Sequence, residues 1–111
     1  MTTTTTTFLG VCVNLAEQVV RQNNVLQRSW VSLASKLPRE HTELLEQFQA
    51  SGEKLKRLLE KLLRMQKALA VGPVADTFQA FLEEELREFE KIAKQATEEA
   101  ELLTTVFELG L

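Results

Sequence analysis

The sequence predicts an all-α fold, an antiparallel up-down-up three-helix bundle with coiled-coil-like packing. Apolar residues recur alternately three and four positions apart through most of the 111 residues, which is the spacing of amphipathic helices. Only two prolines interrupt this pattern, and they divide it into three segments of similar length. Four glycines and no tyrosine are too few turn and strand residues for a β-rich fold.

The chain begins with the uncharged run MTTTTTT, which offers nothing to bury. We therefore expect residues 1–7 to form a disordered threonine-rich tail, followed by a single domain over residues 8–111. The apolar stretch after this tail lacks the basic start of a signal peptide and is interrupted by Asn14. We expect it to be part of the first helix.

The first helix is expected over about residues 8–37, because Pro38 pushes the residue before it out of the α region. Val13, Val20 and Val31 lie beside its apolar seam and widen it, so this helix can face two neighbours. Asn23 is the one polar residue in the seam, where a single Asn often sets register or oligomeric state. The seam itself reads Leu9, Cys12, Ala16, Val19, Asn23, Leu26, Trp30, Leu33 and Leu37.

The second helix is expected over about residues 39–71. Gly72 would take a left-handed cap, and Pro73 prevents continuation. Ser51 could begin a new helix before Gly52, so a break at this point stays open. Its seam reads Leu44, Phe48, Ser51, Leu55, Leu58, Leu62, Met65 and Leu69.

The third helix is expected over about residues 75–109, with DTFQ at Asp76 resembling a capping box. Its apolar face reads Phe78, Leu82, Leu86, Phe89, Ala93, Ala96, Ala100, Leu103 and Phe107. Two steps of four at the start of this face predict imperfect supercoiling there.

Very short connections force neighbouring helices to run antiparallel. Aligning the helix ends places Trp30 level with Phe48 and with residues 93–100, so that a large side chain meets alanines. The same alignment sets basic residues of the second helix against acidic residues of the third, namely Lys54, Lys56, Arg57 and Lys61 against Glu83, Glu84, Glu85, Glu88 and Glu90.

The first helix carries unusually few charges, which gather on one side as Glu17, Arg21 and Arg28. This leaves a charge-free strip at helical spacing, made of Val11, Gln18, Gln22, Val25, Ser29 and Ser32. The strip is either a solvated polar face or a contact surface for another helix, since charged residues are depleted from interface cores. The apolar C-terminal segment adds Phe107, Leu109 and Leu111 as candidate partner-binding residues.

We therefore expect a non-enzymatic scaffold, adaptor or small subunit of a multiprotein complex, acting by helix-on-helix contact with another protein or with its own copies. The alternative is an amphipathic protein that binds a lipid or membrane surface through Lys54, Arg57, Lys61 and Arg64. A net charge of −3 argues against nucleic acid as a partner.

Catalytic chemistry has little basis in the sequence. His41 is the single histidine and lies among acidic neighbours, which excludes multi-histidine metal sites within one chain. Cys12 is the single cysteine and is expected to be a small buried hydrophobe, in keeping with an intracellular, cytoplasmic protein. No phosphate-binding loop is present, so we expect no cofactor, no metal and no small-molecule substrate.

Overall fold

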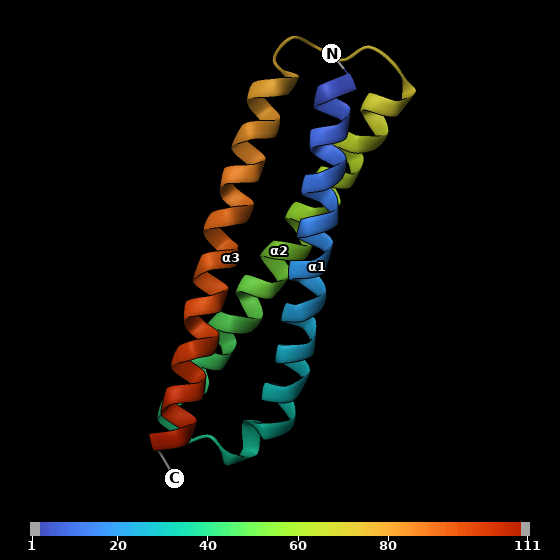
Figure 1. Ribbon diagram of the computed structural model, residues 1–111. Helices are drawn as coiled ribbons and strands as arrows, with labels where there is room; N and C mark the ends of the chain where they lie inside the picture. The colour runs from blue at the N-terminus through green and yellow to red at the C-terminus, as the bar shows by residue number, and fades with distance from the viewer. Residues whose placement is uncertain (1–2, 110–111) are drawn as a thin grey trace.

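The computed structural model describes residues 3–109 and, within them, consists of three long helices and two short 3₁₀ turns. Helix α1 spans Thr3–Leu33, α2 spans Thr42–Val71 and α3 spans Phe78–Leu109. The helices lie side by side as a rod, with α1 and α3 running in the same direction and α2 running opposite to them (Figure 1). The Cα atoms extend over 56 × 19 × 16 Å. The predicted three-helix bundle is confirmed.

Helix α1 begins earlier than expected. Residues 3–7 belong to it, where we expected a disordered threonine-rich tail over residues 1–7, while residues 1–2 lie outside the described residues. Once Leu9 and the following turns are packed, adding one residue costs little, because helix growth needs no new nucleus. The modest helix propensity of threonine does not prevent this extension.

The first connection is longer than expected. Helix α1 ends at Leu33, four residues before the predicted end, and Ala34–Lys36 form a 3₁₀ turn, η1. Leu37 is extended, with φ −78° and ψ 139°, as its position before Pro38 requires. A second turn, η2, covers Arg39–His41 and delays the start of α2 to Thr42.

The second connection also differs from the prediction. Gly72 is extended, with φ 164°, and takes no left-handed cap, although its N–H still donates to the Ala68 carbonyl at 3.4 Å. Helix α3 begins at Phe78, three residues later than expected, and the N–H of Phe81 makes an early helical bond to the Thr77 carbonyl. The Gln79 amide donates to Glu83 instead of reaching back to close a capping box.

The buried side of α1 is rotated from the predicted seam. The residues at every seventh position, Leu9, Ala16, Asn23 and Trp30, are buried as predicted. The second buried row consists of Val13, Val20 and the half-buried Gln27, whereas Cys12 and Val19 are only half-buried. Leu26 of the predicted seam and Val31 beside it are exposed. The rotation arises because α1 packs mainly against α2, which leaves the side toward α3 more open.

The register of α1 against α3 differs from the prediction. Trp30 packs edge-to-face against Phe107, with ring centroids 5.8 Å apart, and Phe107 lies further along α3 than residues 93–100. The prediction had placed Trp30 earlier along α3, because it aligned expected helix ends that differ from those of the structure. The register of α2 against its neighbours is closer to the prediction, since Lys61 pairs with Glu85 at 3.7 Å.

A polar layer crosses the middle of the bundle. Ser51 Oγ of α2 donates to Glu99 Oε1 of α3 at 2.6 Å, and both residues are buried. Gln27 Nε2 of α1 donates to Asn23 Oδ1 at 2.8 Å and to the Phe48 carbonyl at 3.4 Å. Such groups are stable in a core only when paired, so the layer favours this register over slipped ones.

Helix α2 does not break at the point left open by the sequence, and Gly52 has a different role there. The helix is continuous through Ser51 and Gly52, and Gly52 is buried against α1. A Cβ atom here would overlap the Gln27 side-chain nitrogen and lie 2.6 Å from Asn23 Oδ1. The glycine therefore makes room for a neighbouring side chain rather than for a turn.

Candidate functional site

The charge-free strip predicted on the first helix lies on the exposed side of α1. All six of its residues are exposed, and two apolar residues, Phe8 and Leu15, extend the same surface. Together they occupy the side of the helix opposite the buried row. We call this surface the α1 outer face; it consists of Phe8, Val11, Leu15, Gln18, Gln22, Val25, Ser29 and Ser32.

Phe8 and Leu15 were missed as candidate site residues, although the sequence held the signal for them. They precede Gln22 and Ser29 in a row of positions seven residues apart, so all four share one line along the helix. We did not include these two residues because we expected a disordered tail immediately before Phe8. With both included, half of the α1 outer face consists of large apolar side chains.

The polar residues of the α1 outer face fall into two kinds. Ser29 Oγ donates to the Val25 carbonyl at 3.2 Å, and Ser32 Oγ donates to the Ser29 carbonyl at 3.3 Å. These hydroxyls are satisfied by their own helix, so a partner can cover them without leaving a donor unpaired. Within residues 3–109, the amides of Gln18 and Gln22 make no side-chain hydrogen bond to the rest of the chain and remain able to bond a partner.

The charges of α1 lie beside this surface. Arg21 and Arg28 are exposed one row away from Gln18, Val25 and Ser32. Arg21 Nε is directed along its own helix, where it approaches the Glu17 carbonyl at 3.4 Å. The arrangement gives an uncharged centre with charges at one edge, which resembles the core and rim of an interface.

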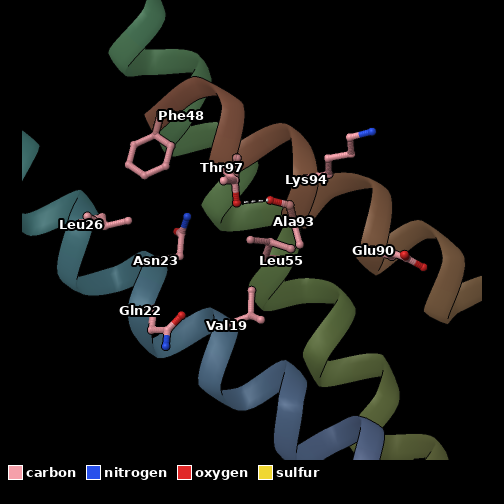
Figure 2. A pocket seen from close by; sticks show the side chains of 11 residues that line it. Val19, Gln22, Asn23, Leu26, Phe48, Leu55, Glu90, Ala93, Lys94 and Thr97 are labelled. Carbon is pink, nitrogen blue, oxygen red and sulfur yellow. Dashed lines mark hydrogen bonds between the residues drawn. The ribbon is translucent and has the colours of Figure 1, made fainter. Parts of the chain in front are cut away.

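A hollow of about 460 Å³ adjoins the α1 outer face where α1 and α3 diverge (Figure 2). Asn23 and Leu26 of α1 point into it, and Phe48 and Leu55 of α2 form its floor (Figure 2). Its remaining lining consists of Val19, Gln22, Glu90, Ala93, Lys94, Ala96 and Thr97, of which Glu90 and Lys94 point outward at the rim. The hollow is mostly apolar and open to solvent.

A second hollow follows the same α1–α3 boundary nearer the start of both helices. It has a volume of about 430 Å³ and lies beside Phe8, with Leu86 on the opposite wall. Its other lining residues are Thr5, Gln79, Glu83 and Arg87. The two hollows therefore follow the α1 outer face along one side of the rod, with Glu83, Arg87, Glu90 and Lys94 of α3 on their far walls.

The three C-terminal candidates are placed differently. Phe107 is half-buried and packs on Trp30, so its ring closes the end of the core. Leu109 is exposed at the end of α3, far along the rod from Val11. Leu111 lies outside the described residues. Phe107 and Leu109 lie at the end of the rod where the strip ends with Ser29 and Ser32, because α1 and α3 run in the same direction, but the Phe107 ring is turned inward onto Trp30.

The basic residues of α2 form a separate exposed row. Lys54, Arg57, Lys61 and Arg64 are all exposed, and Lys61 approaches Glu85 Oε1 at 3.7 Å. The other Glu85 oxygen is buried and has no hydrogen-bond partner among the described residues. At the end of this row, Lys61 and Arg64 border a hollow with Met65, Ala68, Phe78 and Phe81.

The two residues considered for chemistry are isolated. His41 is half-buried before α2 and approaches Glu40 at 3.9 Å, while Cys12 is half-buried, and this burial raises the pKa of its thiol. In the part of the chain that the structure describes, no three His, Cys, Asp or Glu side chains come together as metal ligands would. Among the helices of residues 3–109, none has both the length and the apolarity of a bilayer span.

Comparison with other proteins adds no assignment, because no protein-family model, curated protein or solved structure matches this chain. The function is therefore inferred from the geometry and chemistry of the described residues.

Proposed function

We propose that this protein is a non-enzymatic helical bundle that acts as a scaffold, adaptor or small subunit of a larger assembly. Its mode of action is the docking of an amphipathic helix on the α1 outer face. One observation carries the proposal: eight exposed positions from Phe8 to Ser32, over about seven helical turns, hold no charge. The exposed side of a bundle helix is normally the side that carries the charges.

The chemistry of the α1 outer face supports contact with a protein helix. Monomeric proteins rarely leave apolar patches of more than a few hundred Å² in water, and such patches mark interaction sites. The adjoining hollow between α1 and α3 is mostly apolar and open, so side chains of a docked helix could enter it. The proposal places the protein in the cytoplasm, where a lone thiol such as that of Cys12 stays reduced.

The test is the native size of the protein in an extract of the cells that produce it. We expect the wild-type chain to elute from a size-exclusion column well above its monomer mass of 12.6 kDa. Val25→Glu, at the centre of the α1 outer face, should return it to the monomer position, because a buried unpaired carboxylate disfavours binding. Val31→Glu is the matched control, since Val31 is also exposed on α1 but lies off this face.

Two results would contradict the proposal. Elution of the wild-type chain as a monomer would mean that no stable partner is bound. Equal behaviour of the Val25 and Val31 variants would mean that the α1 outer face does not make the contact.

A second candidate function is binding to an anionic lipid surface. The observation that favours it is the exposed basic row of α2, which ends beside the exposed ring of Phe81. Basic residues next to apolar ones are typical of segments that lie on membranes. Cosedimentation with vesicles containing phosphatidylserine tests this candidate.

The lipid-binding candidate predicts that replacing Lys54, Arg57 and Arg64 by Glu abolishes cosedimentation. The same charge change at Arg87, Lys91 and Lys94 of α3 serves as the control and should retain it. Loss of binding in both triple variants would indicate a nonspecific charge effect, and absence of binding by the wild-type chain would exclude this candidate.

A further inference from the structure

We propose that the α1 outer face binds the α1 outer face of a second copy of this chain, with the two helices antiparallel. This inference rests on the proposed function and names the partner for it. A two-fold axis that passes between the two α1 helices, perpendicular to them and level with residue 20, would generate the pair, giving the closed symmetry that most homodimers have. The bundle cores would then lie on opposite sides of the α1–α1 contact.

The sizes of the side chains favour this antiparallel arrangement. Large residues occupy the first half of the α1 outer face, and small serines occupy its last turns. Antiparallel alignment with maximal overlap places large side chains opposite small ones, as dense packing requires. The facing pairs are Phe8 with Ser32, Val11 with Ser29, Leu15 with Val25, and Gln18 with Gln22 of the second copy.

Polar groups are also accommodated in this pair. The two serine hydroxyls of each copy already donate to carbonyls of their own helix. At the centre, Gln18 of one copy faces Gln22 of the other, and each side-chain amide both donates and accepts hydrogen bonds. Forming this pair therefore does not force any of these polar side chains to lose its hydrogen bonds.

The charges of α1 are compatible with self-association. A face without charge meets its own copy without like-charge repulsion, whereas a charged face would oppose itself in a homodimer. Arg21 of each copy lies at the edge of the contact and near the axis, in solvent. Added salt should therefore strengthen the pair slightly, since it screens the two arginines and disrupts no ion pair.

The exposed area is that of a small but specific interface. Phe8, Val11, Leu15, Val25 and the neighbouring Leu26 are between 44% and 61% exposed. With fully exposed residues of this size presenting on the order of 200 Å², these five offer about 500 Å² per copy. Adding the four polar residues brings the pair to the lower end of the areas that specific interfaces bury.

The test uses two charge variants of purified protein, Leu15→Lys and Val25→Glu, whose positions face each other across the proposed contact. Sedimentation velocity from about 1 to about 500 µM should give a dimer for the wild-type chain. Each variant alone should remain a monomer, because a charge then faces an apolar side chain twice in every dimer. Both positions are exposed, so circular dichroism should show an unchanged helical fold.

Mixing the two variants should restore dimers, because the introduced lysine of one chain then faces the introduced glutamate of the other. A parallel dimer would place position 15 opposite 15 and position 25 opposite 25, so mixing would restore nothing and the antiparallel pairing would be refuted. If the control Val31→Glu also dissociates the dimer, the α1 outer face is not the contact surface. A wild-type chain that stays monomeric throughout this range would refute self-association, whereas the proposed function would survive if that chain still formed a complex in the cell extract.

Discussion

Replacing Gly52 by Ala tests the polar layer that sets the register of the bundle. In most helices this change stabilises, because alanine is favoured over glycine by about 1 kcal/mol in a helix interior. Here the new methyl group would occupy the place of the Gln27 amide, which must then leave Asn23 and Phe48. The buried Asn23 oxygen would lose its donor, at a cost of about 1–3 kcal/mol.

The expected net result is a loss of about 1 kcal/mol, or about 4 °C in melting temperature for a chain of this size. Gly10→Ala is the matched control, since its new Cβ would meet only the end of Gln66, at 3.9 Å. That variant should gain about 0.5–1 kcal/mol. Thermal and urea unfolding, followed by circular dichroism, measure both changes.

A third variant isolates the contact. In a Gln27→Ala background the amide is absent and Asn23 is free to turn away, so Gly52→Ala should cost little or should stabilise. The coupling between the two substitutions should reach about 1 kcal/mol or more in a double-mutant cycle. If Gly52→Ala stabilises the wild-type chain as much as Gly10→Ala does, the close approach of α1 and α2 is wrong.

Three further predictions concern other contacts. Ser51→Ala should destabilise by about 1–3 kcal/mol, because it leaves the buried Glu99 carboxylate without its donor. Glu99→Met should cost less stability than Ser51→Ala in the same unfolding assay, because the Ser51 hydroxyl can turn to its own helix. A larger loss for Glu99→Met would contradict this pairing. Phe107→Ala should lower stability by about 1–3 kcal/mol and shift the emission of Trp30, the one tryptophan, to longer wavelength; an unchanged spectrum would argue against the register of α1 and α3. Burial raises the pKa of the Cys12 thiol, so less thiolate is present at pH 8 than in the unfolded chain. Iodoacetamide should therefore react with the Cys12 thiol faster in denaturant than in native buffer, and the native rate should rise at higher pH. Equal rates in denaturant and in buffer would contradict the burial of Cys12.

The fold class was predictable because the spacing of apolar residues is a strong signal over 30 residues. The row of Leu9, Ala16, Asn23 and Trp30 is buried as this spacing requires. The ends of the helices were less predictable, because they depend on tertiary packing and on short 3₁₀ turns around Pro38. Errors of three to five residues at these ends added up to the error in the register of Trp30.

The candidate site was predicted in part. The six residues of the charge-free strip are exposed on one side of α1, because charge pattern and helical period together define a face. The hollow beside them could not be predicted, since it depends on how far α1 and α3 diverge. The role of Gly52 was equally hidden, because the sequence does not reveal which side chain of another helix lies against it.

Photo-crosslinking tests the central claim, that the α1 outer face is a docking surface, most directly. A photoreactive amino acid is placed at position 25 or, as the control, at position 31, in cells that produce the protein. We expect a crosslinked protein adduct from position 25, to a second copy of the chain, and none from position 31. Adducts of equal yield from both positions, or adducts from position 31 alone, would contradict it.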